Sequence, residues 1–294
     1  FAMDGFLGER TRYRNWFFQG CFCETAATIV SGCTAERTNL WAYCLYTVWM
    51  TGIIYPIVVH WTWSGYGWLN YANSDGVYQS TFSSAAYMDF AGSGVIHLVG
   101  GVGGLVGAII VGPRKDRFNP KKADDFLPHS INFIVLGTFI LWFGWYGFNP
   151  GSTGSMHTYD TAVKSGLVAC NTSLAACMAG LTVFLLRFFL TQKIDVAGLC
   201  NGILAGLVAV TAPCAVIQPW EAIIIGLVGG LIYQGSSMLI PWLKIDDPVD
   251  ACSVHLANGL WGIIAVGLFG DKATGFGGNG SFYGGDQLGV QLVA

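Results

Sequence analysis

Charged residues are scarce in this sequence, with only 14 Lys and Arg and 17 Asp and Glu among 294 positions. Soluble domains carry charge on about a quarter of their residues, whereas the share here is 11%, and 53% of the residues are hydrophobic. This composition excludes a soluble domain, a disordered chain and a coiled coil. The net charge of −3 gives no basic surface for a polyanion, so we expect no nucleic-acid partner. A polytopic membrane protein is the class that remains.

Cysteine is present at nine positions, but its placement does not indicate a disulfide framework. Almost all nine cysteines lie inside apolar runs rather than in polar loops. We therefore interpret them as small buried hydrophobic residues.

Long apolar runs divide the chain into predicted membrane spans. A helix needs about 20 apolar residues to cross roughly 30 Å of hydrocarbon, and eight segments meet this requirement. They cover residues 13–35, 40–61, 92–112, 130–149, 164–187, 195–214, 219–242 and 250–269. Glycines recur at four-residue spacing inside them, as at Gly100 and Gly104 or Gly202 and Gly206, and small residues at that spacing let helices pack closely in lipid. The prediction is an all-α polytopic membrane protein.

The basic residues orient these spans. Five of them fall in the loop 113–129, and four more lie at turns that the span order places on the same side, whereas the opposite loops hold only Lys164 and Lys272. The positive-inside rule predicts that the 113–129 loop is cytoplasmic and the aromatic 62–88 loop external. Arg10, Arg12 and Arg14 disagree, and we give them less weight because they precede the first span.

Two of the spans contain an acid followed by a histidine. Asp89 precedes His97 by eight residues, and Asp250 precedes His255 by five. An ionisable side chain at the centre of a span costs about 2.5–3.5 kcal/mol, so each needs a reason. We expect both acids to cap free amides at a helix start. Equivalent helices of inverted repeats meet at the bilayer midplane, which favours a histidine pair in a pore.

Two other interpretations of these histidines stay open. A lone histidine is more often a core residue satisfied by a neighbour. A metal site is disfavoured because neither helix offers a second histidine or a glutamate at ligand spacing, and Cys252 is the only nearby soft ligand. We expect no metal and no cofactor.

Aromatic residues gather where spans end on the outer side. The run 144–152 (GWYGFNPGS) places bulky rings, a proline break and Ser152 together, and Trp63 and Phe22 fall where they can face the same mouth. Ring faces attract a cation by about 0.5–2 kcal/mol each. The alternative is an interfacial belt with core packing.

The remaining polar residues are less informative. We expect His60 to be interfacial, and Glu24 and Glu221 to pair inside the bundle. Asn279 begins a glycosylation sequon in a predicted external loop.

Taken together, these motifs resemble those of the ammonium transporter (Amt/Mep/Rh) family, in particular its plant and algal Amt type. The resemblance runs from Asp89 through the glycine-rich helix to Arg114, and recurs at 17–37, 143–152, 198–211 and 246–255. It covers essentially the whole chain.

The resemblance implies eleven helices per subunit, in an inverted repeat, and a homotrimer with one pore per subunit. The eight spans would be the third to the tenth, so residues 1–294 would form a single domain that lacks the first two helices, most of the last helix and the cytosolic tail. It implies recruitment of substrate at Trp63, Phe22 and Ser152, with Asp89 as the acid that organises this site. It implies a hydrophobic gate of Phe22 and Phe148, and a pore pair of His97 and His255, with Asp250 as a structural acid.

The function that the resemblance implies is passage of ammonium or ammonia across a membrane, expected to be the plasma membrane, with deprotonation before a hydrophobic pore. The expected partners are the lipid bilayer, the ammonium substrate and an unidentified cytosolic regulator. An ammonium receptor with the same architecture is the alternative. A membrane enzyme fits poorly, because no nucleophile or ligand set accompanies the histidines.

Overall fold

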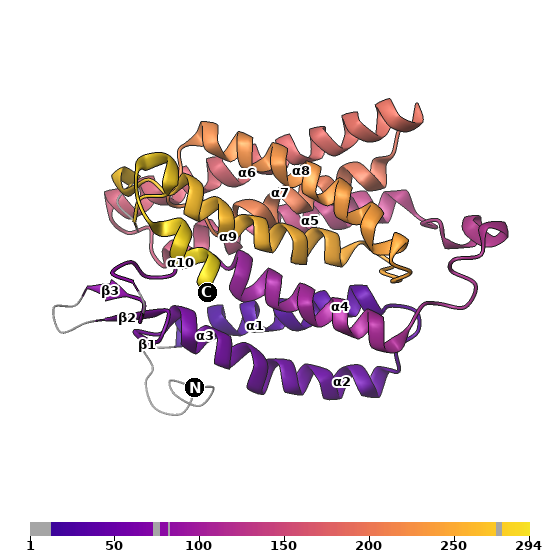
Figure 1. Cartoon of the computed structure of the whole chain (residues 1–294), viewed down its shortest axis with the longest axis horizontal. Coiled ribbons are helices and arrows are strands. Elements are labelled where there is room, and N and C mark those ends of the chain that lie inside the picture. Colours follow the sequence, from indigo (N-terminus) through magenta and orange to yellow (C-terminus); the bar gives the residue numbers. More distant parts are fainter. Residues whose placement is uncertain (1–12, 73–76, 82, 275–277) are drawn as a thin grey trace.

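The computed structural model describes residues 13–72, 77–81, 83–274 and 278–294, with only the backbone described at 71 and 72. Its helices lie side by side along the long axis of the molecule (Figure 1). Within the described residues, six helical segments are long and apolar enough to cross a membrane. They are Leu40–Trp63, Ser93–Val111, Ile131–Thr153, Tyr159–Thr191, Pro219–Trp242 and Cys252–Phe269. The predicted all-α, multi-pass membrane protein is confirmed.

The helices follow the order of the predicted spans. The α-helices are α1 Tyr13–Thr34, α2 Leu40–Trp49, α3 Tyr55–Trp63, α4 Val99–Val111, α5 Ile131–Phe148, α6 Tyr159–Thr191, α7 Val196–Thr211, α8 Pro219–Trp242, α9 Asn258–Phe269 and α10 Gln287–Val293. Three π-helical segments continue into α-helices: η2 Met50–Ile54 joins α2 to α3, η3 Ser93–Leu98 leads into α4, and η6 Cys252–Ala257 leads into α9. The remaining two predicted spans, 13–35 and 195–214, correspond to α1 and α7.

Polar side chains at the loop ends begin several helices. Asn39 accepts a hydrogen bond from the amide of Trp41 at the start of α2. Thr158 forms a capping box with Thr161 at the start of α6, and Asp195 accepts from the amide of Gly198 in α7. These caps satisfy amides that have no partner within the helix.

Glycine allows the closest approach between helices. A Cβ atom placed on Gly206 of α7 would lie 2.4 Å from the carbonyl oxygen of Ala175 in α6. One placed on Gly202 would lie 2.9 Å from Val183. Any larger residue would push these helices apart, so the four-residue glycine spacing in α7 serves helix packing, as predicted.

A reciprocal glycine contact relates the two helices that carry the histidines. Gly101 follows His97 by four residues, and a Cβ on it would lie 2.5 Å from the amide nitrogen of Leu256. Gly259 follows His255 by four residues, and a Cβ on it would lie 2.8 Å from the amide nitrogen of Leu98. Each glycine therefore faces the residue that follows the other histidine. This symmetry supports the expected inverted repeat.

The two loops used for orientation lie at opposite ends of the molecule (Figure 1). At one end, β1 Tyr66–Gly67, β2 Asn70–Ala72 and β3 Tyr78–Gln79 form an antiparallel sheet beside α10. At the other end, the 113–129 loop follows α4. This separation agrees with the predicted orientation. Of the three arginines that argued against it, Arg10 and Arg12 lie outside the described residues, whereas Arg14 lies in the first turn of α1.

Buried ion pairs hold the basic end together. The carboxylate of Asp246 is fully buried and accepts hydrogen bonds from Arg114 Nε at 2.8 Å and Arg117 Nε at 3.2 Å. Arg37 donates to the carbonyl oxygens of Gly112 and Asp246. Because Arg114 follows α4 and Asp246 precedes η6, these bonds join the end of α4 to the start of the η6–α9 helix, so the two helices run in opposite directions.

We expect Asp246→Ala to destabilise the protein in a pH-dependent way. Removing one partner of a buried ion pair costs about 3–5 kcal/mol. Burial alone would raise the pKa of Asp246, but hydrogen bonds and charge from Arg114 hold this pKa below its usual value. The stabilisation is therefore complete above the unfolded pKa of about 3.9 and is lost as the pH falls through the lower folded pKa.

Thermal unfolding in detergent between neutral pH and about pH 3 tests this expectation. The difference between wild type and Asp246→Ala should be largest at neutral pH and shrink below about pH 4. Asp125→Ala, which removes an exposed acid of the same end, should unfold like wild type throughout. A difference that did not change with pH would contradict the assigned ion pairs.

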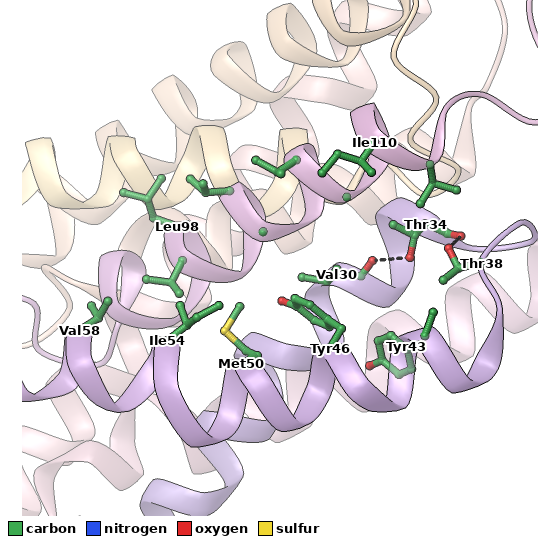
Figure 2. Close-up of a pocket in the computed structure, with 17 residues that line it drawn as sticks. Val30, Thr34, Thr38, Tyr43, Tyr46, Met50, Ile54, Val58, Leu98 and Ile110 are labelled. Carbon is green, nitrogen blue, oxygen red and sulfur yellow. Dashed lines mark hydrogen bonds between the residues drawn. The ribbon is translucent and has the colours of Figure 1, made fainter.

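An apolar groove of about 620 Å³ runs between α1, α2 and α4. Figure 2 shows Val30, Tyr46, Met50 and Ile110 among its lining side chains. Neither His97 nor His255 lines this groove, and its walls are almost entirely apolar. We therefore assign it to the membrane-facing surface rather than to the functional site.

Candidate functional site

Asp89 caps the helix that carries His97. Its Oδ1 accepts hydrogen bonds from the amides of Gly92 and Ser93, and its Oδ2 accepts from those of Gly94 and Val95, all at 2.8–2.9 Å. The side chain is buried. The tight turn requires a left-handed conformation at Gly92, with φ of 107°, which glycine adopts without strain. With both oxygens engaged by amides, Asp89 shapes the start of the helix, as the sequence predicted.

The second helix is capped by a different acid from the one predicted. Asp247 Oδ2, not Asp250, accepts the amide hydrogen of Cys252 at 2.6 Å. Asp247 precedes His255 by eight residues, the same separation as between Asp89 and His97. Asp250 instead has φ of 58° and accepts a hydrogen bond from the hydroxyl of the buried Tyr233 at 2.8 Å. Its side chain therefore joins the loop to α8 and does not cap η6.

The two histidines meet between the capped helix ends. His97 Nδ1 and His255 Nδ1 lie 3.1 Å apart, a hydrogen-bond distance. The rings are stacked with centroids 5.2 Å apart. One of the two Nδ1 atoms must therefore carry the proton that the other accepts.

His97 is fully buried, and its second nitrogen is unsatisfied. Its exposed fraction is 0%, and Nε2 has no hydrogen-bond partner within the described residues. A buried polar atom without a partner is unusual in a folded protein. It is the atom of this site that is available to a small hydrogen-bonding molecule.

Aromatic rings enclose His97. The indole of Trp145 stacks on the imidazole at 5.2 Å with an interplanar angle of 13°, and the ring of Phe148 lies 5.3 Å away. Trp145 Nε1 donates to Thr211 Oγ1 at 3.0 Å, which fixes the indole. The sequence analysis did not assign Trp145. Its position three residues before Phe148 on α5 was the available signal, because residues three apart share a helix face.

Phe22 and Phe148 form a stacked pair next to the histidines. Their ring centroids lie 4.3 Å apart, with an interplanar angle of 26°. Phe22 comes from α1 and is buried, whereas Phe148 ends α5 and is half-buried. The Phe148 ring contacts both Phe22 and His97, so Phe148 links Phe22 to the imidazoles.

Trp63 lies on the other side of Phe22. Its ring centroid is 6.1 Å from that of Phe22, and its Nε1 donates to the carbonyl oxygen of Asp89 at 2.8 Å. Trp63 and Asp89 also line a cavity of about 680 Å³ at the end that holds the small sheet. Ser152 donates to the carbonyl oxygen of Phe148 at 2.8 Å, which attaches it to the same corner. Trp63 therefore links this cavity to Phe22, because its ring contacts Phe22 and its side chain lines the cavity.

The other polar residues lie elsewhere. His60 is exposed on α3, and Glu24 is exposed on α1. Glu221 is buried and accepts hydrogen bonds from Tyr283 Oη and from the amide of Gln218, both at 2.6 Å, so it has the interior pairing expected of it. Asn279 is half-buried and hydrogen-bonds within its own loop; its glycosylation stays a prediction.

Comparison with known proteins decides the family. Residues 4–294 match the Ammonium Transporter Family. The chain belongs to the ammonium transporter family. The resemblance inferred from the motifs is confirmed, and the family is one of transporters rather than enzymes.

Several plant and fungal relatives of this family are similar to the chain. It is 45% identical to Ammonium transporter 1 member 1 of Arabidopsis thaliana over 265 residues, which cover 87% of this chain and 52% of that protein. It is 44% identical to Ammonium transporter 1 member 2 of rice, Oryza sativa subsp. japonica, over 88% of this chain and 54% of that protein. The chain thus spans about half the length of the curated relatives it matches.

Solved structures of the family have the same fold. A structure described as a sensor Amt protein superposes with a TM-score of 0.81 at 36% identity, over 96% of this chain and 66% of that one. Mep2 of Candida albicans superposes with a TM-score of 0.78 at 33% identity, over 94% of this chain and 58% of that one.

Proposed function

We propose that this ammonium transporter family member moves ammonium or ammonia across a membrane along a path from Trp63, past Phe22 and Phe148, to His97 and His255. The observation that carries the proposal is the pair of imidazoles in hydrogen-bond contact directly beside the stacked phenylalanines. A histidine that served only to stabilise the fold would need a single hydrogen-bond partner. Two histidines that satisfy each other and leave a buried nitrogen free support a polar path.

The first step is capture of the cation at the mouth. Ammonium carries a charge that the faces of Trp63 and Phe22 attract through their ring electrons. Ser152 contributes a hydroxyl oxygen that can accept a hydrogen bond while its hydrogen is donated to Phe148. Asp89 acts indirectly. Its carboxylate accepts hydrogen bonds from four backbone amides, which fixes its position. Its carbonyl oxygen accepts a hydrogen bond from Trp63 Nε1 and so holds the indole in place.

The second step is transfer of a proton from ammonium to water at the outer side, which leaves neutral ammonia to pass the rings. The stacked Phe22 and Phe148 rings offer no hydrogen bond, so an ion that passed them would have to leave its water, at a cost of many kcal/mol. The free-energy cost of leaving water is far lower for neutral ammonia. Potassium has no proton to give up, and this difference would exclude it.

The third step is passage along the histidines. Ammonia is both a donor and an acceptor of hydrogen bonds, and it can exchange partners with His97 Nε2 and with the shared Nδ1 contact. An imidazole pair can also pass on a proton, because each ring both accepts and donates. The proton then either follows the substrate or stays on the outer side.

The setting of this activity is part of the proposal. We propose a homotrimer in the plasma membrane. Because the proposed path lies within a single chain, each subunit would have its own path. The basic end, with Arg114 and Arg117, faces the cytoplasm. A cytosolic regulator would act at that end.

A growth assay tests the proposed function. A microbial strain that lacks its own ammonium transporters should grow on low ammonium as sole nitrogen source when it makes this protein. It should not grow when it makes a membrane-inserted His97→Ala/His255→Ala form. Failure of growth with correctly inserted wild type would overturn the proposal.

Reception of ammonium is the second candidate function. It is favoured by the similarity to the sensor Amt protein, which superposes on this chain with a TM-score of 0.81. A receptor would bind ammonium at the same mouth without supporting growth. Binding without flux in purified protein would therefore select this alternative.

We expect Phe148→Ala to make the path less selective. Loss of the Phe148 ring removes its stacking on Phe22 and leaves only Phe18 at 4.3 Å from that ring, which admits water beside His97. Potassium should then permeate liposomes that hold the variant, measured as a potassium flux that wild type lacks. Phe143→Ala, which removes an exposed ring from the same helix, should show no potassium flux, like wild type. Absence of a potassium flux with both variants would contradict the assignment of Phe22 and Phe148 as the gate.

A further inference from the structure

Two buried thiols face each other at the basic end, outside the path described above. Cys33 lies in the last turn of α1 and Cys252 begins η6, 219 residues further along the chain. Their Sγ atoms are 3.6 Å apart, and their exposed fractions are 0% and 1%. Both are free thiols in the structure. Packing of α1 against η6 therefore brings together two soft ligands that are remote in sequence.

Asp247 adds a third ligand. One of its carboxylate oxygens lies within 4.8 Å of both sulfur atoms. Oδ2 accepts the amide hydrogen of Cys252, whereas Oδ1 is buried and has no hydrogen-bond partner within the described residues. The residue is 8% exposed. The neighbouring Asp246 takes the contacts from Arg114 and Arg117, and in the described part of the chain no ion pair reaches Asp247.

An unpaired carboxylate is costly in this position. Asp247 is buried, so its charged form loses its water. Buried charges in proteins are generally paired or coordinate a metal. A cation at this point would stabilise the carboxylate and both thiolates at once.

We propose that Cys33, Cys252 and Asp247 form a binding site for a thiophilic divalent cation, Zn²⁺ in the first instance. Two sulfur atoms 3.6 Å apart, each about 2.3 Å from one ion, subtend an angle of about 103° at it, which is close to tetrahedral. The carboxylate supplies a third ligand, and water or a carbonyl oxygen the fourth. Binding releases the two thiol protons and leaves two thiolates and one carboxylate on the cation.

The site would connect two elements of the fold. Cys252 and His255 belong to the same π-helical segment, and Cys33 belongs to α1, which also carries Phe22. A bound ion would therefore tie α1 to the segment that holds one of the paired histidines. The inference does not depend on the proposed function, because it concerns binding of the ion itself.

Cadmium binding to the purified protein tests the site. Cd²⁺ replaces Zn²⁺ at thiolate ligands, and its sulfur-to-metal charge-transfer absorption reports the bond. The four exposed cysteines should first be alkylated; these are Cys21, Cys44, Cys170 and Cys177. We expect one ion per chain in wild type, and an affinity at least about tenfold weaker in Cys33→Ser and Cys252→Ser.

Two further variants sharpen the test. Asp247→Asn keeps an acceptor for the Cys252 amide but removes the anionic ligand, so binding should weaken while folding is retained. Cys214→Ser removes a buried thiol that contacts Thr211 rather than the cluster, and it should bind like wild type. Equal binding by all variants, or none by folded wild type, would overturn the proposal.

X-ray absorption of the zinc-loaded wild-type protein provides a measurement that needs no substitution. The proposal predicts two sulfur ligands at about 2.3 Å and oxygen ligands at about 2.0–2.2 Å. A coordination shell without sulfur would overturn it even if the cysteine variants failed to fold.

Discussion

Replacement of Asp89 by Ala should lower the free energy of unfolding by at least about 4 kcal/mol, since four buried amides would each lose an acceptor worth about 1 kcal/mol or more. The amides belong to residues 92–95, and no other acceptor is assigned to them at this helix start. Folded proteins are stable by only about 5–15 kcal/mol. The variant should therefore be largely unfolded or lost on extraction into detergent.

Asp89→Asn separates the effect of hydrogen bonding from that of volume. It retains one acceptor oxygen, so its stability should fall between those of wild type and Asp89→Ala. Asp160→Ala removes an exposed acid from the first turn of α6 and should cost less than about 1 kcal/mol. Thermal unfolding monitored by size-exclusion chromatography ranks the four proteins. Wild-type stability of Asp89→Ala would contradict the capping role.

His97→Ala and His255→Ala should each reduce ammonium flux by about 2- to 10-fold, with the protein still assembled. Each removes one partner of the 3.1 Å contact, and a hydrogen bond between neutral groups contributes about 0.5–1.5 kcal/mol. His97→Ala also leaves the faces of Trp145 and Phe148 without their stacked imidazole. The narrow polar path would then become an apolar one.

The matched control is His60→Ala. His60 also belongs to a membrane-spanning helix but is exposed on α3, so its loss should leave flux unchanged. Uptake of isotopically labelled ammonium into proteoliposomes measures all three variants against wild type. Equal uptake by wild type and both pore variants would show that the substrate does not pass the paired histidines.

Much of the fold could be predicted from composition and short-range pattern. The scarcity of charge and the length of the apolar runs predicted the helices, because a bilayer imposes both requirements on each span separately. The role of Asp89 could also be predicted, since its amides lie within the next six residues. Such local features depend on few distant contacts.

The capping acid of the second helix shows where short-range pattern fails. Three acids, Asp246, Asp247 and Asp250, precede η6, and all are close enough to cap it by sequence alone. Arg114 donates a hydrogen bond to Asp246, and Tyr233 donates one to Asp250. Asp247 is therefore the acid that accepts from the backbone amide of Cys252. Those partners come from the loop after α4 and from α8, and only the tertiary structure reveals them. The eight-residue spacing shared with Asp89 was the one available clue.

Contacts between distant segments were also invisible to sequence analysis. Cys252 was identified as a soft ligand without a companion, because Cys33 lies 219 residues away. The stacking of Phe22 on Phe148 likewise joins α1 to α5; it was expected from the family resemblance rather than from spacing. Residue pattern identifies which side chains need a partner, whereas packing decides which partner each obtains.

Parallel recording of electrical current and luminal pH in proteoliposomes tests whether ammonium or ammonia passes the histidine pair. An inward ammonium gradient should evoke a signal with wild-type protein, as current if the charge crosses or as luminal alkalinisation without current if ammonia alone crosses. An equal potassium gradient should evoke neither. Absence of any ammonium-dependent signal from folded, inserted protein, or an equal response to potassium, would contradict passage of ammonium through the histidine pair.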